Sequence, residues 1–372
     1  MNNNFSKKIL IVTDFYTPHI SGIVTYIDQM ISFFKKKKFI VTVLTTKHNT
    51  DLKISEYHKS INIIRCNPTF SISRGTYSFE LIKKFLLIYK NYDYINVHYP
   101  LTEIFPLIFL LKKKNTILNY HCLPEFGILN IIFKSYFYFF GLIATIKSKK
   151  TVVLSKDYFE NIFFQKYFSF NLLEIPPFVN KYDAKLINFS KKKNKEIIIG
   201  FLGRICKEKG IEILLKLSDL FIKRNINHKI LIAGNLNDKR FKKYIDNLLF
   251  ISKNNKNIKF LNKINEGDKL KFFNRIDVFI LPSVNSFEAF GIVQLEAMNH
   301  GVPVIATDIK GVRSVINKTS NGFLFKKNNV KELAEKILKI KDSNQLNKQS
   351  IIKKTKDNYN KLLFEGLVEK LF

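Results

Sequence analysis

The chain has 372 residues, 46% of them hydrophobic, and no long polar linker, which predicts about two globular domains and excludes an intrinsically disordered protein. The apolar stretch near the N-terminus is too short for a signal peptide, and the three cysteines lack metal-binding spacing, so we expect a cytoplasmic protein with reduced thiols. The net charge of +32 has two explanations: attraction to an anionic partner, or AT-rich codons that favour lysine, asparagine, isoleucine, phenylalanine and tyrosine.

Strands and helices alternate in the first half of the chain, which predicts a doubly wound parallel sheet. Apolar runs indicate strands at residues 8–14, 39–44, 61–66, 94–98, 116–121 and 151–155. Gly22 lies in the polar turn after the first of these, where a glycine lets a ligand approach the backbone; a plain strand-to-helix turn is the alternative. His121 ends its strand at the ligand-binding edge of such a sheet, unless it is only a hydrogen-bonded strand tip.

One apolar run, Phe126–Ile146, is long enough to raise the question of a membrane span. Asn130, Lys134 and other small or polar residues interrupt it, and the strand that follows is needed in the first sheet. We therefore expect a helix of the first domain, at most lying on a membrane surface through the basic residues Lys147, Lys149 and Lys150. The segment Phe33–Phe39 is a second aromatic and basic patch that would support such peripheral contact, although a solvated helix end is the usual explanation of such a run.

A domain boundary is expected where a strand closed by Pro176 and Pro177 is followed by lysine-rich sequence up to Lys195. The next strand, residues 196–202, leads into a turn that contains Gly203, Arg204, Lys209 and Gly210. Two cations beside glycines at one strand-to-helix turn suit a diphosphate, because a guanidinium can donate to two oxygens and an ammonium adds a point charge. The alternative is a pair of surface cations in a lysine-rich protein.

The most informative stretch runs from a buried strand at 277–281, through a polar loop and a helix, to another strand at 302–306. Free N–H groups around Ala289, Phe290 and Gly291 would favour an anion such as a phosphate. Glu296, about two helical turns on, can accept two hydrogen bonds, for example from the vicinal hydroxyls of a ribose. Further strands at 229–234, 258–261 and 322–325 complete the second sheet, and helices are expected beyond Val330.

Glu288 and Glu296, with Ala-Phe-Gly after the first and Gly-Val-Pro-Val-Ile-Ala-Thr-Asp after the second, resemble the glutamate pair of glycosyltransferase family 4. The resemblance implies the α/β GT-B fold, in which two doubly wound Rossmann-like domains face each other across a cleft and a C-terminal helix crosses back to the first. We expect an acceptor-side domain at 1–180, a nucleotide-sugar domain at 181–350 and that helix at 351–372. It also implies retaining transfer of a sugar from a UDP- or GDP-linked donor to a saccharide or lipid-linked saccharide, in cell-surface polysaccharide or glycolipid synthesis.

The resemblance also carries site residues over to this chain. It assigns catalysis to Arg204, Lys209, Glu288 and His121. It assigns donor binding to Gly22, Gly203, Ile264, Ala289, Phe290, Gly291 and Glu296, with the backbone at Ile264 reading the base. The family's first loop usually has two glycines, and here Ser21 replaces one of them; Pro177 and Phe178 replace an Asn-Gly pair.

No cofactor and no metal requirement are expected, because no Asp-x-Asp motif lies at a strand end. Another GT-B enzyme, such as a nucleotide-sugar epimerase or a phosphorylase, is an alternative with the same fold. A nucleic-acid-binding protein would explain only the charge, because the sequence has no zinc pattern, RNA-binding aromatic signature or helix-turn-helix. We therefore expect no nucleic-acid partner.

Overall fold

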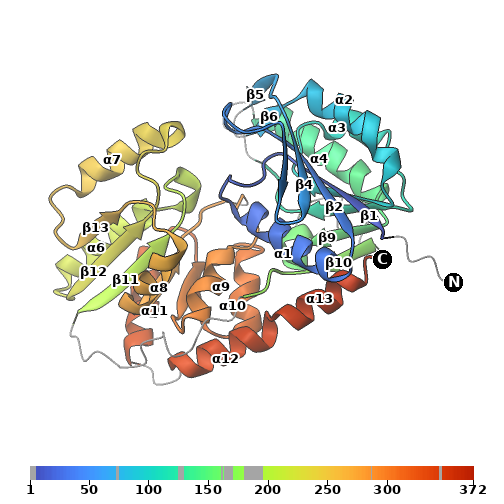
Figure 1. The fold of residues 1–372 in the computed structure, drawn as a ribbon. Helices are drawn as coiled ribbons and strands as arrows, with labels where there is room; N and C mark the ends of the chain where they lie inside the picture. The colour runs from blue at the N-terminus through green and yellow to red at the C-terminus, as the bar shows by residue number, and fades with distance from the viewer. Residues whose placement is uncertain are drawn as a thin grey trace. The chain divides into compact units, whose positions relative to one another are not determined.

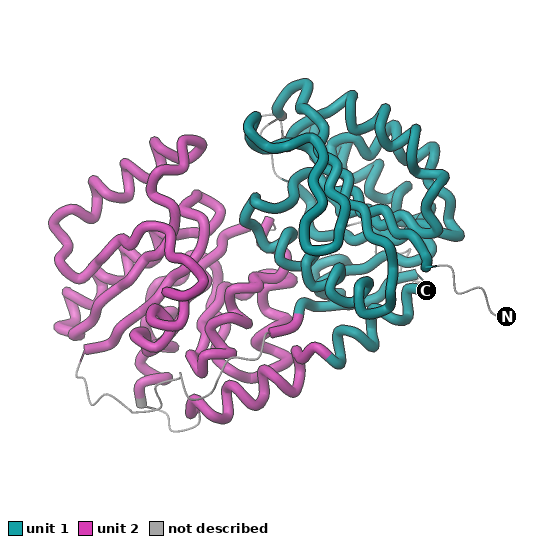
Figure 2. The backbone as a smooth tube through the Cα atoms, in the orientation of Figure 1, with its two compact units in different colours: residues 1–177, 362–372 teal, residues 178–361 magenta. Residues whose placement is uncertain are grey.

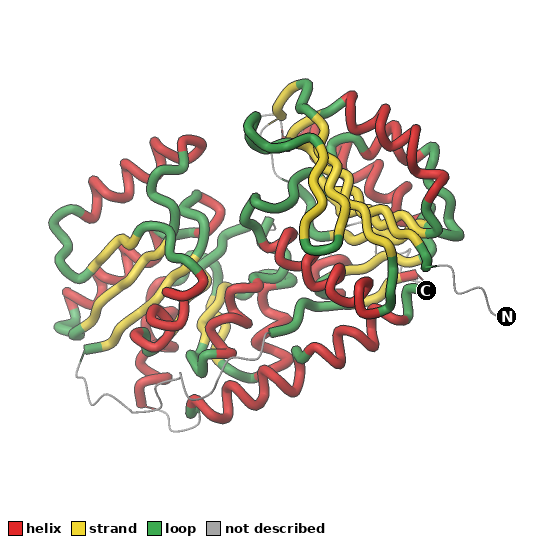
Figure 3. Tube along the Cα trace, in the orientation of Figure 1, coloured by secondary structure: helices red, strands yellow, loops and turns green. Residues whose placement is uncertain are grey.

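The computed structural model describes residues 6–72, 75–124, 130–160, 162, 171–179, 196–285, 287–342 and 346–372. The chain divides into two compact units, residues 1–177 with 362–372 and residues 178–361 (Figure 2). Each unit is built on a mainly parallel sheet with helices packed along it (Figure 3). This confirms the predicted α/β class with two Rossmann-like units. The lysine-rich segment 181–195, where the sequence places the domain boundary, lies outside the described residues.

Among the described residues, the sheet of the first unit has eight strands in the order β10-β9-β8-β7-β1-β2-β4-β3, and of these only β3 runs antiparallel to its neighbour. The strands are β1 (Lys8–Thr13), β2 (Ile40–Thr46), β3 (Ser55–His58), β4 (Ile61–Cys66), β7 (Tyr94–Tyr99), β8 (Thr116–Tyr120), β9 (Lys150–Val153) and β10 (Leu172–Glu174). A separate antiparallel pair is formed by β5 (Phe70–Ile72) and β6 (Gly75–Tyr77). The central strands are buried on both faces, which is why they appear in the sequence as continuous apolar runs.

Two helices, α1 (Gly22–Lys36) and α13 (Lys361–Glu369), pack together in the first unit. The Lys36 ammonium pairs with the Glu365 carboxylate at 2.5 Å, Lys37 pairs with Glu369, and the aromatic ring of Phe34 lies 5.9 Å from that of Phe372. Phe33 and Phe34 are buried. The expected membrane patch at Phe33–Phe39 is therefore wrong: its first two aromatic rings belong to the core, and two of its lysines are neutralised by α13.

The remaining helices of the first unit are α2 (Phe79–Ile88), which continues into the short 3-10 helix η1 (Tyr89–Asn91), α3 (Ile104–Ile108), α4 (Asn130–Ile146) and α5 (Lys156–Phe159). Figure 1 shows α2, α3 and α4 gathered along one face of the sheet, with α1 on the other. Of the expected helix Phe126–Ile146, residues 126–129 lie outside the described part of the chain. Among the described helices none, α4 included, is long and apolar enough to cross a membrane.

The sheet of the second unit has six parallel strands in the order β13-β12-β11-β14-β15-β16. They are β11 (Ile197–Leu202), β12 (His228–Ala233), β13 (Ile258–Leu261), β14 (Val278–Leu281), β15 (Val304–Thr307) and β16 (Gly322–Phe325). One face packs its apolar side chains against α6 (Glu212–Lys223), α7 (Lys242–Ser252) and α11 (Val330–Asp342). The other helices are α8 (Glu266–Arg275), α9 (Ile292–Asn299), α10 (Val312–Thr319) and α12 (Lys348–Asn358), and two short 3-10 helices are η5 (Lys207–Lys209) and η6 (Lys239–Phe241).

The C-terminal segment differs from the single helix expected at 351–372. It forms two helices, and the first of them, α12, packs on α9 and α10 within the second unit. The amide of Asn321 secures it by donating to the carbonyl of Ile351 at 2.9 Å and to the hydroxyl of Thr355 at 3.0 Å. Residues 351–361 thus belong to the second unit, and residues 362–372 to the first.

Candidate functional site

The sheet of the second unit reverses its winding between β11 and β14. The chain proceeds from β11 outward to β12 and β13, and then returns to the other side of β11 to form β14. At such a switch point the two loops that leave the carboxyl ends of the strands diverge, and open α/β sheets bind ligands there. The loop from Gly203 to Gly210 follows β11, and the loop from Pro282 to Gly291 follows β14. These two loops form the candidate site.

An ion pair joins the two loops. The Lys209 ammonium donates to a carboxylate oxygen of Glu288, and the same oxygen accepts a hydrogen bond from the Ser283 hydroxyl at 3.2 Å. Each of the paired side chains is only 15% exposed. The backbone N–H of Val284 also donates to the carbonyl of Glu208 at 2.9 Å. Lys209 and Glu288, predicted from separate motifs, are therefore brought together, and their charges neutralise each other before a ligand binds.

Two positions in these loops require glycine. Gly210 has φ +63°, and a Cβ there would lie 2.2 Å from the carbonyl oxygen of Pro282. Gly291 has φ +77°, and its Cβ would lie 2.5 Å from a methyl group of Leu281. Side chains are therefore excluded at both positions. At Gly203 a Cβ would find only ordinary contacts, the nearest 3.4 Å away, so the protein's own packing does not require that glycine.

Arg204 lies exposed at the start of the first loop, with its guanidinium 5.6 Å from the centre of the Phe287 ring in the second loop. An arginine over an aromatic face is held by a cation–π interaction while its N–H groups stay available to a ligand. Arg204 and Lys209 thus both reach across from the first loop to the second.

The start of α9 offers hydrogen-bond donors. The side chains of Ala289 and Phe290 are 8% and 2% exposed, and the N–H groups of Ala289, Phe290 and Gly291 have no partner among the described residues. The Gln294 amide donates to the carbonyl of Phe290 at 2.9 Å and to that of Val312 at 3.1 Å, which fixes the loop. Together with the positive end of the helix dipole, these N–H groups favour an anion.

Glu296 lies on α9 and is 27% exposed. Its carboxylate accepts from the Lys269 ammonium at 3.1 Å, and Lys269 also pairs with Glu266 at 2.8 Å. Burial raises the pKa of Glu296, and the charge of Lys269 opposes that rise. Ile264 is half-buried in the loop between β13 and α8, just before the helix cap Asn265, whose side chain accepts from the N–H of Asp268 at 2.9 Å.

In the first unit, Gly22 is exposed at the first position of α1. The hydroxyl of Ser21 accepts from the N–H of Val24 at 3.3 Å and so caps that helix. The residue that departs from the two-glycine pattern therefore has a structural role of its own, because serine is among the preferred N-cap residues.

His121 stacks on a second histidine at the same edge of this sheet. Its Nε2 lies 2.9 Å from Nδ1 of His98, and Tyr26 covers the ring edge-on at 5.5 Å between ring centres. Burial lowers the pKa of His121 to about 3, and burial together with the neighbouring His121 lowers the pKa of His98 well below its usual value, so both rings are neutral at physiological pH. Since Nε2 of His121 is engaged with His98, its Nδ1 is the nitrogen that remains for another partner.

Two carboxyl groups close to this edge were not predicted, the half-buried Asp14 and the buried Glu103. Asp14 directly follows β1 and accepts from the Thr76 hydroxyl at 3.0 Å; Glu103 accepts from the N–H of Ser78 at 2.7 Å. Burial raises the pKa of Glu103 to about 7, and burial with the nearby charge of Glu103 raises that of Asp14 to about 8. The position of Asp14, immediately after the first strand, was the only sequence signal for this pair.

Other residues that were not assigned to the site support the predicted ones: Ser283 on Glu288, Gln294 on the second loop, Lys269 on Glu296 and His98 on His121. Gln294 precedes Glu296 by two positions, and His98 ends a predicted strand, so both had a positional signal. Lys269 had none, because nothing distinguishes it from the many other lysines of the chain.

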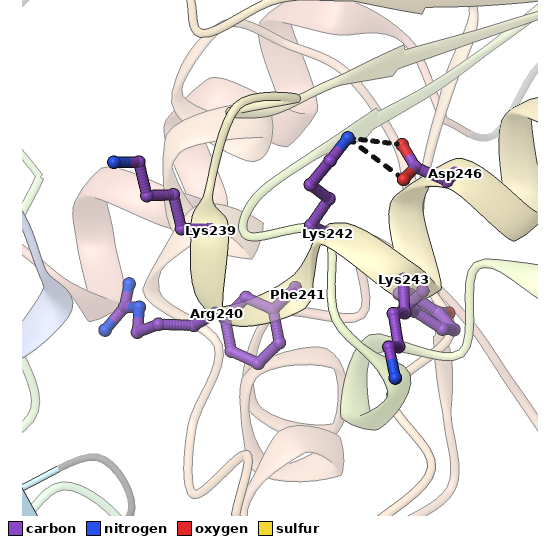
Figure 4. A pocket seen from close by; sticks show the side chains of 7 residues that line it. Lys239, Arg240, Phe241, Lys242, Lys243 and Asp246 are labelled. Carbon is purple, nitrogen blue, oxygen red and sulfur yellow. Dashed lines mark hydrogen bonds and ion pairs between the residues drawn. The ribbon is translucent and has the colours of Figure 1, made fainter.

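A basic hollow lies on η6 and α7, beyond the end of β12 (Figure 4). Its lining residues are Lys239, Arg240, Phe241, Lys242, Lys243, Tyr244 and Asp246. Arg240 is paired with Asp238 at 2.7 Å and Lys242 with Asp246 at 3.0 Å, so two of its cations are already neutralised. Among the described residues there is no group of three or more His, Cys, Asp or Glu side chains that could hold a metal ion.

The second half of the chain is similar to known proteins. Residues 183–357 match the family described as glycosyl transferases group 1. The chain is 32% identical over 161 residues to the capsular polysaccharide biosynthesis glycosyltransferase CapM of Staphylococcus aureus, covering 43% of this chain and 40% of that protein. It is 27% identical over 360 residues to an uncharacterized glycosyltransferase of Methanocaldococcus jannaschii, covering 92% and 90% of the two chains.

Solved structures share the fold over nearly the whole chain. Sucrose-phosphate synthase from Thermosynechococcus elongatus superimposes with a TM-score of 0.77 at 18% identity, covering 98% of each chain. Anabaena HepE in complex with UDP-glucose gives a TM-score of 0.68 at 16% identity, again with 98% of each chain covered. The chain therefore has the GT-B fold, and its residues 183–357 are similar to the glycosyl transferases group 1 family.

Proposed function

We propose that the chain is a retaining glycosyltransferase that moves a sugar from a UDP- or GDP-linked donor to a saccharide or lipid-linked saccharide acceptor. The observation that carries this proposal is the set of cationic and N–H groups at the switch point of the second unit: Arg204, Lys209 and the N–H groups of residues 289–291. A diphosphate is the ligand group that such a set suits best. The similarity to HepE, solved with UDP-glucose, supports the same choice of donor.

The catalytic contribution of these groups is to stabilise the leaving diphosphate. When the bond between the sugar C1 and the phosphate oxygen breaks, negative charge grows on that oxygen. Arg204 can donate two parallel hydrogen bonds to phosphate oxygens, Lys209 adds a point charge, and the N–H groups before α9 add fixed dipoles. Lys209 must then share its charge between Glu288 and the diphosphate, which gives Glu288 control over how strongly Lys209 binds the donor.

Among the routes to retention, the state of the two glutamates favours a front-face displacement over a double displacement. A double displacement needs a free carboxylate as nucleophile, but Glu288 is held by Lys209 and Glu296 by Lys269. We therefore assign a front-face displacement, in which the acceptor oxygen forms its bond to C1 on the side that the diphosphate leaves. The acceptor proton passes to an oxygen of the departing diphosphate, so neither carboxylate has to act as a base.

The other predicted residues are assigned to binding. Glu296 accepts hydrogen bonds from the ribose hydroxyls, the backbone at Ile264 contacts the base, and Gly22 and Gly203 allow the donor to approach the backbone. His121, neutral and with Nδ1 remaining, contacts the donor sugar. We place the reaction in the cytoplasm, in the synthesis of a cell-surface polysaccharide or glycolipid, and the sequence similarity to CapM supports that setting.

The test is a donor titration with a matched pair of variants. UDP- and GDP-linked sugars are titrated calorimetrically into the wild-type chain, into Arg204→Ala, and into Arg224→Ala, which removes another exposed arginine, at the end of α6. We expect one nucleotide class to bind, a loss of about 10- to 100-fold in Arg204→Ala because charge-assisted hydrogen bonds disappear, and no change in Arg224→Ala. Equal binding by both variants would remove Arg204 from the site, and failure of every donor to bind would contradict the proposed activity.

A further inference from the structure

The surface formed by α3 and α4 in the first unit is apolar where a soluble helix is normally polar. In α4, Ile132, Phe139 and Ile146 are 68%, 55% and 40% exposed, and their spacing places them along one side of the helix. The opposite side packs inward through Phe137 and Ala144, which are buried. A helix that is apolar on its solvent side as well as its core side is typical of a surface that has a partner.

The neighbouring helix α3 continues this apolar surface. Phe105 and Phe109 are 45% and 67% exposed, and their ring centres lie 5.6 Å apart. Phe105 also contacts Phe140 of α4, with the ring centres 4.9 Å apart. Figure 1 shows α3 and α4 on the same side of the sheet. The exposed aromatic and aliphatic side chains of the two helices therefore form one surface, which we call the α3–α4 surface.

Lysines are frequent in the sequence that contains and flanks α3 and α4, and acidic residues are absent from the two helices. Between Ile104 and Lys156 the sequence has eight lysines, at positions 112, 113, 114, 134, 147, 149, 150 and 156, and one acidic residue, Glu125. Lys112 and Lys114 are exposed at the end of α3. The Lys147 ammonium lies 5.9 Å from the centre of the Phe109 ring and donates to the carbonyl of Ile108 at 3.0 Å, which places a positive charge beside an exposed aromatic side chain.

We propose that the α3–α4 surface docks on an anionic lipid bilayer, as a peripheral contact. A bilayer surface supplies the two things that this surface lacks: negative charge for the lysines and an apolar layer for the phenylalanine and isoleucine side chains. A second copy of the chain fits less well, because a two-fold interface would bring the same lysines face to face and they would repel. This proposal does not depend on the sugar donor or on the catalytic residues.

The experiment is sedimentation of the full chain with vesicles of phosphatidylcholine alone or mixed with phosphatidylglycerol, over a range of salt concentrations. Two variants remove parts of the surface: Lys112→Gln with Lys113→Gln and Lys114→Gln, and Phe109→Ser with Phe139→Ser. A third variant, Lys256→Gln with Lys326→Gln and Lys327→Gln, removes three exposed lysines of the second unit. Both lysine variants lower the net charge from +32 by three to +29, so they differ only in where the charge is lost.

We expect the wild type to bind the anionic vesicles, and binding to weaken as salt rises. The lysine variant on the α3–α4 surface should bind about 100-fold more weakly, since each lysine near an anionic surface contributes about a fivefold increase in binding, whereas the second-unit control should bind nearly as the wild type does. The phenylalanine variant should lose the part of vesicle binding that persists at high salt, because that part comes from inserted aromatic side chains.

Equal weakening in both lysine variants would overturn the proposal in favour of a general charge effect. Equal binding to neutral and anionic vesicles, or no binding to either, would also overturn it. A wild-type dimer that the phenylalanine variant converts to a monomer would assign the surface to a second copy instead. Thermal unfolding at the wild-type temperature shows that each variant is folded.

Discussion

Replacing Glu288 by glutamine separates donor binding from the rest of the reaction. In the free protein the Lys209 ammonium is neutralised by the Glu288 carboxylate, and both side chains are 15% exposed. A glutamine keeps the size of the side chain and an oxygen for the Ser283 hydroxyl, but removes the negative charge. Lys209 then meets an arriving diphosphate with an uncompensated charge, so we expect Glu288→Gln to bind UDP or GDP more tightly than the wild type.

The size of the effect follows from the charges involved. The Glu288 carboxylate and a bound diphosphate carry like charges, and two such charges about 6 Å apart at an effective dielectric constant of about 20–40 repel each other by about 1.5–3 kcal/mol. Removing the Glu288 charge should therefore improve nucleoside diphosphate affinity by roughly 10- to 100-fold. Unfolding should become easier by about 1–3 kcal/mol in the absence of nucleotide, because a mostly buried lysine loses its partner. Saturating nucleotide should restore that stability.

Calorimetric titration and thermal unfolding with and without nucleotide measure both effects. Glu335→Gln, which removes the same charge from an exposed position on α11, is the control and should leave affinity and stability unchanged. Unchanged or weaker nucleotide binding in Glu288→Gln would refute the reasoning, because it would show that Lys209 does not face the diphosphate. Turnover should nevertheless fall in this variant, since Glu288 is assigned a catalytic role.

Three further predictions follow from the site and from the Asp14 and Glu103 carboxyl groups. Arg204→Ala and Lys209→Ala should each lower kcat/KM, with a loss of transition-state stabilisation of about 2–4 kcal/mol. Wild-type turnover in both variants would remove these residues from the site. Activity should survive excess EDTA, because cationic side chains and N–H groups neutralise the diphosphate; loss of activity that Mn²⁺ restores would contradict this. Between about pH 6.5 and 8 the free energy of unfolding should fall as pH rises, because Asp14, whose pKa rises from 3.8 to about 8 on folding, keeps its proton only in the folded state. Below about pH 6.5 the buried rings of His98 and His121, whose pKa values fall on folding, oppose this slope. Asp14→Asn should flatten that dependence by up to about 1.4 kcal/mol per pH unit, and an unchanged slope in chemical denaturation would show that Asp14 is already ionised in the fold.

The apolar strands could be predicted from the sequence because each central strand is buried on both faces. Ile197–Leu202 and Val304–Thr307 are continuous apolar runs for that reason. The β3 strand was missed because it lies at an edge and alternates exposed with half-buried side chains such as Glu56 and His58. The Phe33–Phe39 segment was misread because sequence alone could not show that α13, more than 300 positions away, supplies Glu365 and Glu369 to its lysines.

In the candidate site, too, local features could be predicted from the sequence and contacts between distant residues could not. Glycines that the backbone requires, such as Gly291, stand out locally because a helix start and a tight turn coincide there. Pairings between distant residues do not: Lys209 and Glu288 are 79 positions apart, and Lys269 and Glu296 are 27 apart. Composition hides them further, since lysine is abundant throughout the chain. Only the sheet order, which sets β14 beside β11, brings the first pair together.

The most direct test of the proposed reaction is the anomeric configuration of its product. The purified chain is incubated with the nucleotide sugar that binds it and a saccharide acceptor, and the product is followed by proton NMR. From an α-linked donor we predict a new α-glycosidic signal that appears as nucleoside diphosphate is released, and that is lost in Arg204→Ala. A β-linked product would contradict the retaining front-face displacement, and consumption of the donor to an epimerised sugar without any acceptor would contradict glycosyl transfer itself.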